Sequence, residues 1–278
     1  MKVKLITSLL VLLGYSSATY AGHHVSDKVI SEQREKLAEN TQGKGFGPQA
    51  PRDIDNISGV NHRVFGTAPD FKKMNLCNIH FHKNAEHKGG EFTTYAGNGD
   101  GKGNETGYVY SGSLTSSELI PFENDKSLKP GDTIEVHYVY SSADVQPGST
   151  LGACIADGIS NPALRVEGQV YVLVNDDNAL DFITLNKVAQ TGDYYQAPNL
   201  PSNTGKPIEY AGSTTGPSYN EKGSPFQVTW SVRPMVKKVN ISTVVEWLKN
   251  NPFEERKAHG VRNLVINPKL LSDSESKS

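Results

Sequence analysis

The chain lacks the features that would place it in a specialised class of protein. Its formal net charge is only −2 over 278 residues, so no excess of positive charge suggests a nucleic-acid partner. Its two cysteines are too few for a disulfide-rich scaffold. The sequence shows no internal repeat and no long helical pattern. The length and composition fit a globular protein of one large domain or two modest ones.

The longest apolar run lies near the N-terminus, over Leu5–Leu13. A transmembrane helix needs about 20 apolar residues, so this run is too short to span a bilayer. Lysines precede it and small residues follow it, which is typical of a secretory signal peptide cleaved after Ala18 or Ala21. We expect the mature protein to be exported, periplasmic or secreted, without stable membrane insertion. In that oxidising setting Cys77 and Cys154 are expected to form one disulfide.

The chain beyond residue 51 has β-type patterning. Runs of β-branched and aromatic residues, bounded by Gly, Pro, Asn and Asp, predict strands at Asn78–His82, Thr133–Tyr140, Gln169–Val174 and Gln227–Val232. Long turn-rich stretches separate these runs. The pattern predicts a mainly β fold, in a single domain around a mostly antiparallel sheet with long loops and a few short helices.

Helices are expected near the two ends. Residues 26–40 are rich in helix formers but poor in apolar residues, which indicates a surface helix or a mobile lead-in. Thr243 and Glu246 form a capping-box pattern at the start of a second helix, and Pro252 ends it. The expected organisation is a signal peptide at 1–21, a lead-in segment at 22–46, one domain at 47–271 and a polar tail at 272–278.

Three of the eight histidines lie within residues 77–92. Because alternate side chains of a strand share a face, His80 and His82 are expected to point to the same side of the sheet. Two imidazoles fixed in this way need only one further ligand to hold a zinc ion. The alternative interpretation is a polar strand face without a metal.

The third ligand has two candidates in the sequence. His87 is next to Glu86 and close to the first two histidines. His137 lies in a predicted strand, where it shares a face with Glu135 and Val139. The residue pattern alone leaves both candidates open.

The same residues resemble the zinc site of alpha-class carbonic anhydrases. In that family a His-x-His strand and a Glu-x-His strand supply three ligands, and a Glu-His pair lies between them in the sequence. This chain has His80-Phe81-His82, then Glu86-His87, then Glu135-Val136-His137. Further similar segments follow the family's order, from about Gly47 to Leu248: residues 47–55, 210–217, 228–230 and 239–242.

Finer details resemble the delta class of carbonic anhydrases more closely. A cysteine stands just before the His-x-His strand, and a second follows the Glu-x-His strand. The run Asn-Ile-His-Phe-His at residues 78–82 and the run at residues 260–268 are also similar to that class. The resemblance implies an exported enzyme with a large twisted sheet like that of alpha carbonic anhydrases.

The resemblance further implies the chemistry. Zn²⁺ is the expected cofactor, with His80, His82 and His137 as its ligands. Zinc-bound hydroxide would attack CO₂ to give bicarbonate and a proton, so the expected partner is a small-molecule substrate. His87 is then expected to support the site without binding zinc.

Supporting roles follow from strand alternation and from the resemblance together. Asn78 and Glu135 each stand two residues before a ligand, so each is expected to accept a hydrogen bond from that ligand's imidazole. The resemblance implies that Glu86 acts with a threonine to orient the hydroxide. The chain has no Leu before its Thr-Thr pair, which leaves Thr214 and Thr215 both as candidates.

The remaining candidates concern the pocket and the proton. His62 is a candidate proton shuttle, with an ordinary surface histidine as the alternative. Val139, Val170 and Trp230 are candidate apolar walls of the CO₂ pocket, and each also fits a core position.

Two other functions are compatible with parts of the pattern. His80, His82, Glu86 and His137 loosely match the metal motifs of cupins, in which Glu86 would itself bind iron or manganese. A periplasmic zinc-binding protein without catalysis is the second alternative. Neither explains the Thr-Thr pair.

Overall fold

The computed structural model describes residues 24–63, 66–159 and 161–273. The expected signal peptide at residues 1–21 therefore lies outside the described residues, as does most of the expected polar tail. None of the described helices combines the length and the apolarity needed to cross a membrane.

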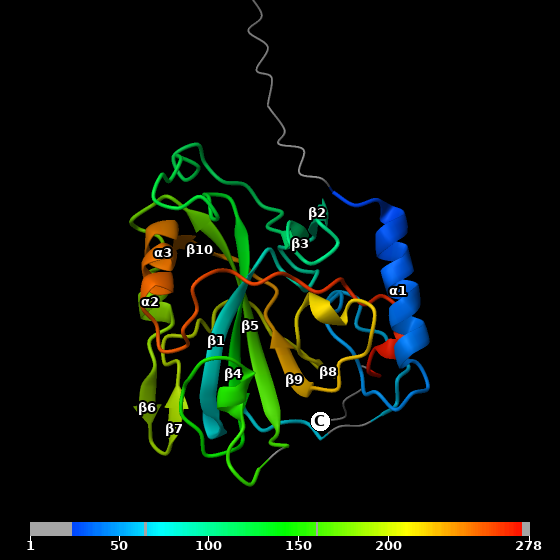
Figure 1. The fold of residues 1–278 in the computed structure, drawn as a ribbon. Helices are drawn as coiled ribbons and strands as arrows, with labels where there is room; N and C mark the ends of the chain where they lie inside the picture. The colour runs from blue at the N-terminus through cyan, green and yellow to red at the C-terminus, as the bar shows by residue number, and fades with distance from the viewer. Residues whose placement is uncertain (1–23, 64–65, 160, 274–278) are drawn as a thin grey trace, which may run out of the picture.

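A mixed sheet of six strands forms the centre of the fold (Figure 1). Its order is β1-β4-β5-β9-β8. Both β9 and β10 pair with the same edge of β5: β9 with its first half and β10 with its last four residues. Three of the pairings are antiparallel, and the two between β5 and its partners β9 and β10 are parallel. The strands are β1 (Asn75–Lys83), β4 (Thr133–Ser141), β5 (Leu164–Val174), β8 (Ile208–Ser213), β9 (Gln227–Val232) and β10 (Lys237–Asn240). The expected single, mainly β domain is confirmed.

All four predicted strands are present, as β1, β4, β5 and β9. The sequence pattern does not indicate β8 or β10. Nor does it indicate two hairpins, formed by β2 (Thr94–Asn98) with β3 (Thr106–Val109) and by β6 (Ala189–Thr191) with β7 (Tyr194–Gln196). These strands are short, at three to six residues each, so pairing partners rather than local preference define them.

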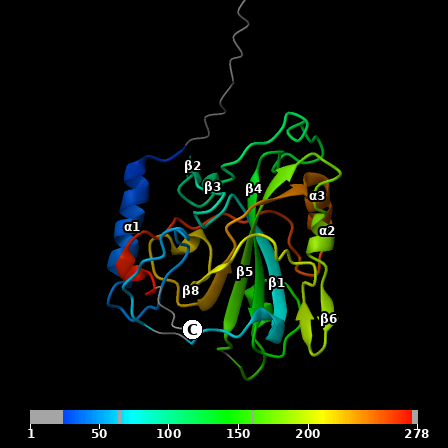
Figure 2. The same ribbon diagram turned by 180° about the vertical axis from the view of Figure 1, so that it is seen from behind.

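In the described part of the chain, three α-helices lie outside the sheet: α1 (Asp27–Thr41), α2 (Phe182–Leu185) and α3 (Ile241–Lys249). Figures 1 and 2 show α1 at one side of the molecule and α2 with α3 at the other. The expected capping box is wrong, because Asn240 caps α3 by accepting from the Ser242 N–H. The Thr243 hydroxyl instead donates to the Asn240 carbonyl.

The two faces of the sheet have different contents. Along β4, Val136 and Tyr138 point to a core that includes Trp247 of α3. Val139 belongs to a second core on the opposite face, together with Trp230. Strand alternation therefore places Glu135 and His137 on the side of this second core. The functional site is on that side.

Candidate metal centre

His80, His82 and His137 meet where β1 pairs with β4. His80 is the direct cross-strand partner of His137, and His82 is the partner of Glu135. One ring nitrogen from each of the three histidines lies within 4.8 Å of the other two. All three side chains are buried. The expected ligand set is therefore brought together, with a spacing suited to a metal ion.

Each of these imidazoles is held at one nitrogen by an acceptor. The Nδ1 of His80 donates to Asn78 Oδ1 at 2.7 Å, and the Nδ1 of His82 donates to the Gly260 carbonyl at 2.8 Å. The Nε2 of His137 donates to Glu135 Oε1 at 3.0 Å. Because a neutral imidazole carries one proton, the nitrogens left with a lone pair are Nε2 of His80, Nε2 of His82 and Nδ1 of His137.

The electrostatics keep these rings neutral. Burial lowers the pKa of His80 well below its usual value, and the neighbouring histidines lower it further. Burial likewise lowers the pKa of His82 to about 4. Burial also lowers the pKa of His137, although the hydrogen bond to Glu135 opposes that shift. Neutral imidazoles are the form that binds a metal ion.

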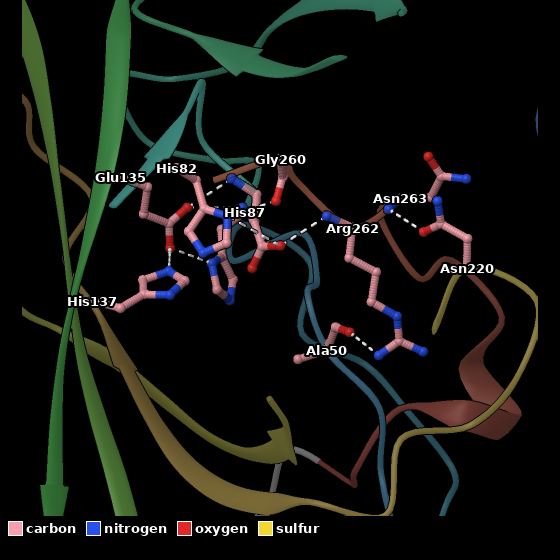
Figure 3. A network of polar contacts seen from close by, with 10 residues as sticks. Ala50, His82, His87, Glu135, His137, Asn220, Gly260, Arg262 and Asn263 are labelled. Atoms are coloured by element: carbon pink, nitrogen blue, oxygen red, sulfur yellow. Dashed lines mark hydrogen bonds and ion pairs between the residues drawn. The ribbon is translucent and has the colours of Figure 1, made fainter. Parts of the chain in front are cut away.

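Glu135 is the central acceptor behind the site (Figure 3). Its Oε1 accepts from His137 and, at 2.6 Å, from His87 Nδ1. Its Oε2 accepts from the backbone N–H groups of Glu86 and His87. Burial alone would raise the pKa of Glu135, but the adjacent His87 and the hydrogen bonds from both histidines hold it well below its usual value.

A second group, His87, Glu135 and His137, is also compact enough for a metal ion. Neither nitrogen of His87 is free to bind a metal ion. Its Nδ1 donates to Glu135, and its Nε2 accepts from the Tyr210 hydroxyl at 2.6 Å. Glu86 belongs to neither group among the described residues, so the cupin ligand set is not formed. The first group is the better metal site.

A cavity of about 860 Å³ opens onto the three histidines. Glu86, Thr214 and Thr215 all line it. Burial raises the pKa of Glu86, whose Oε1 accepts from the Arg262 N–H at 2.7 Å. Among the hydrogen bonds of the described residues, none joins Glu86 to either threonine. The Thr215 Oγ1 is buried without a partner.

Arg262 hydrogen-bonds to two segments that are distant in the sequence, at residues 49–50 and at Ser213. Its guanidinium donates to the Ala50 carbonyl, as Figure 3 shows, and also to Gln49 Oε1 and Ser213 Oγ. Burial lowers the pKa of Arg262 to about 10. Since Ser213 immediately precedes Thr214, this arginine holds the turn that carries both threonines.

The three residues expected to form the apolar walls of the CO₂ pocket do not line the cavity. Val139, Val170 and Trp230 belong to the second core and are absent from the cavity lining that the described residues form. Trp230 instead packs against His137, with ring centroids 4.9 Å apart. The apolar residues that do line the cavity are Leu151, Pro217, Tyr219, Phe253 and Ala258.

The structure brings to the cavity a histidine that the sequence pattern does not single out. His259 lines the cavity, stacks on His80 with centroids 5.1 Å apart, and hydrogen-bonds through Nε2 to Glu255 at 2.7 Å. His62 does not line the cavity, and its side chain is 76% exposed and 3.5 Å from Asp273. The only sequence signal for His259 was its position beside the run at residues 260–268.

The disulfide between Cys77 and Cys154 is present. Cys77 lies on β1, and Cys154 ends the short 3-10 turn η2 (Leu151–Cys154). The bond therefore attaches this turn to the strand that carries His80 and His82.

Comparison with known proteins gives one family. The sequence model described as delta carbonic anhydrase matches residues 71–243, a range that contains all three histidines of the cluster and ends before His259. No curated protein matches. Among solved structures, an alpha-carbonic anhydrase from Thermovibrio ammonificans, in complex with the inhibitor sulfanilamide, is 18% identical, with 78% of this chain and 87% of that chain covered and a TM-score of 0.27.

Proposed function

This chain belongs to the delta carbonic anhydrase family, and on that premise we propose that it hydrates CO₂ reversibly at a zinc ion held by His80, His82 and His137. The observation that carries the proposal is the arrangement of ring nitrogens. Three of them converge with free lone pairs, and the other three are each committed to an acceptor.

Three neutral nitrogen ligands suit zinc, which in catalytic sites takes three protein ligands and keeps one position open. Bound zinc would supply the Lewis acidity that makes hydroxide available from water near neutral pH, as is established for carbonic anhydrases in general. The protein's own contribution is to hold the imidazoles neutral and in one tautomer. Burial keeps them neutral, and Asn78, Glu135 and the Gly260 carbonyl fix the tautomer.

Thr215 is the group proposed to orient the nucleophile. A buried hydroxyl without a partner costs about 1–3 kcal/mol, so the unpaired Thr215 Oγ1 in the lining of the cavity fits a partner that arrives with the reactants. We expect Thr215→Val to lower kcat/KM for CO₂ by about 100-fold, the loss typical of one positioned hydrogen-bonding group. Zinc content should stay unchanged.

Thr214→Val is the matched control, and it should have clearly the smaller effect. Stopped-flow CO₂ hydration by both variants, with zinc measured by atomic absorption, checks this. The reverse order would assign the orienting role to Thr214.

His259 is proposed to carry the proton from the cavity to solvent through its ring, with Glu255 holding Nε2. In weak buffer, His259→Ala should reduce kcat by about 100-fold, the lower end of what a positioned acid–base group contributes. Added imidazole should restore much of the rate, because it can accept the proton in place of the side chain. His62→Ala should behave like the unmodified protein. A His259→Ala variant with full activity in weak buffer would remove His259 from the mechanism.

Zinc dependence tests the proposed function as a whole. Removal of the metal with a chelator should abolish CO₂ hydration, and one equivalent of zinc should restore it. Zinc-loaded, folded protein that does not hydrate CO₂ would support a non-catalytic zinc-binding role instead. We further propose that the mature enzyme works outside the cytoplasm, after removal of the expected signal peptide.

A further inference from the structure

One wall of the cavity is attached to β1 at both of its ends. Four of its residues, 149–152, line the cavity. At one end, the Gly148 N–H donates to the Cys77 carbonyl at 3.0 Å. At the other end, Cys154 forms the disulfide with the same Cys77. We name residues 148–154 the wall loop.

The wall loop also contacts the residue that supports His80. Asn78 Nδ2 donates to the Gly148 carbonyl at 3.1 Å, and Asn78 Oδ1 accepts from His80 Nδ1 at 2.7 Å. Asn78 is buried, with an exposed fraction of 1%. Its amide thus bridges the wall loop and a metal ligand.

The direction of this bridge is set by chemistry. A carbonyl only accepts, so the Gly148 oxygen requires the NH₂ end of the Asn78 amide. The oxygen of that amide must then face His80, where it selects the tautomer protonated at Nδ1. If the amide turned over, its NH₂ would face His80 Nδ1 and favour a proton on Nε2, the nitrogen needed for the metal.

We propose that the Cys77–Cys154 disulfide, through the wall loop and the Gly148 carbonyl, is a positioning device that fixes the tautomer of His80. The proposal rests on the proposed function, since it assumes that His80 Nε2 binds zinc. Asn78 and the wall loop act on the metal only through His80.

The test compares a variant without the disulfide, Cys77→Ala with Cys154→Ala, against the unmodified protein. Zinc affinity is measured by chelator competition. In addition, long-range ¹H–¹⁵N NMR of the metal-free protein at neutral pH reports which nitrogen of His80 carries the proton. Without the disulfide, zinc affinity should fall about tenfold or more, the usual effect of losing a group that orients a ligand. The spectrum should show a new fraction of His80 protonated at Nε2.

Asn78→Asp provides the decisive background. Either carboxylate oxygen of Asp can accept from His80 Nδ1. The tautomer of His80 then no longer depends on the Gly148 carbonyl. Removing the disulfide from the Asn78→Asp variant should therefore change zinc affinity by less than about twofold. The effects of the two changes would then not add, as expected when both act on one network of contacts. Val145→Ala, in the second core outside the wall loop, controls for general destabilisation and should leave the zinc affinity and the spectrum unchanged.

Three results would overturn the proposal: a folded disulfide-free variant with normal zinc affinity, an unchanged His80 tautomer, or an equal loss of affinity in the Asn78→Asp background. If the disulfide-free variant does not fold, the NMR spectrum of metal-free unmodified protein before and after reduction by a water-soluble phosphine decides. In that reduction the phosphine is oxidised to its oxide with oxygen from water, and the disulfide becomes two thiols. Separately, normal zinc affinity in His80→Ala would contradict the metal centre itself.

Discussion

His137→Ala should lose both bound zinc and CO₂ hydration, whereas His87→Ala should keep its zinc. His137 offers the free Nδ1 that completes the cluster with His80 and His82. Its loss should weaken zinc binding by more than the roughly 10- to 100-fold that loss of a supporting residue costs. Zinc content after dialysis and stopped-flow hydration rates measure the two effects.

The control in this pair is informative because His87 is equally buried and equally well bonded. Both of its nitrogens are engaged, one by Glu135 and one by Tyr210. His87→Ala leaves these partners unpaired and should lower the free energy of unfolding by about 1–3 kcal/mol. The metal should remain, since no ligand is removed. If His87→Ala loses zinc and His137→Ala retains it, the ligand assignment is wrong.

Glu135→Gln should damage both the metal site and the fold, although it only replaces one carboxylate oxygen by an NH₂ group. The carboxylate accepts two hydrogen bonds at each oxygen, whereas an amide presents one oxygen and one NH₂. In either orientation the NH₂ faces two donors. If it faces His137 Nε2, the favoured tautomer places the proton on Nδ1, which then cannot bind the metal.

The expected result is a fall in zinc affinity of about 10- to 100-fold. We also expect the free energy of unfolding to fall by about 3–5 kcal/mol, as when a buried charge network loses one partner. Chelator competition and urea denaturation measure the two quantities.

Glu167→Gln is the matched control for this prediction. Glu167 is also a buried carboxylate on a central strand, bonded to Arg165 and Ser231 and away from the cavity. It should lose stability but keep its zinc affinity. Equal zinc affinities in Glu135→Gln and the unmodified protein would show that Glu135 does not orient His137.

The part of the site that could be predicted from the sequence depends on strand alternation. A spacing of two residues places His80 with His82, Asn78 with His80, and Glu135 with His137, and all three relations hold in the structure. The choice of His137 over His87 came from a family resemblance. The structure adds a physical reason, since the nitrogens of His87 are occupied.

The part that could not be predicted depends on contacts between distant segments. His259 and Arg262 lie in an irregular stretch, which is positioned by backbone bonds such as Lys83 N–H to the His259 carbonyl. Alternation correctly placed Val139 on the face of the metal centre. It could not show that the core behind the histidines fills this space, so that loops supply the rest of the cavity lining.

The position of the metal itself tests the central claim most directly. Crystals of the zinc-loaded protein should give one strong anomalous peak at the zinc edge, about 2.0–2.1 Å from Nε2 of His80, Nε2 of His82 and Nδ1 of His137. Glu86 and His87 should not be ligands. A peak between His87, Glu135 and His137, or bonded to Glu86, would contradict the account.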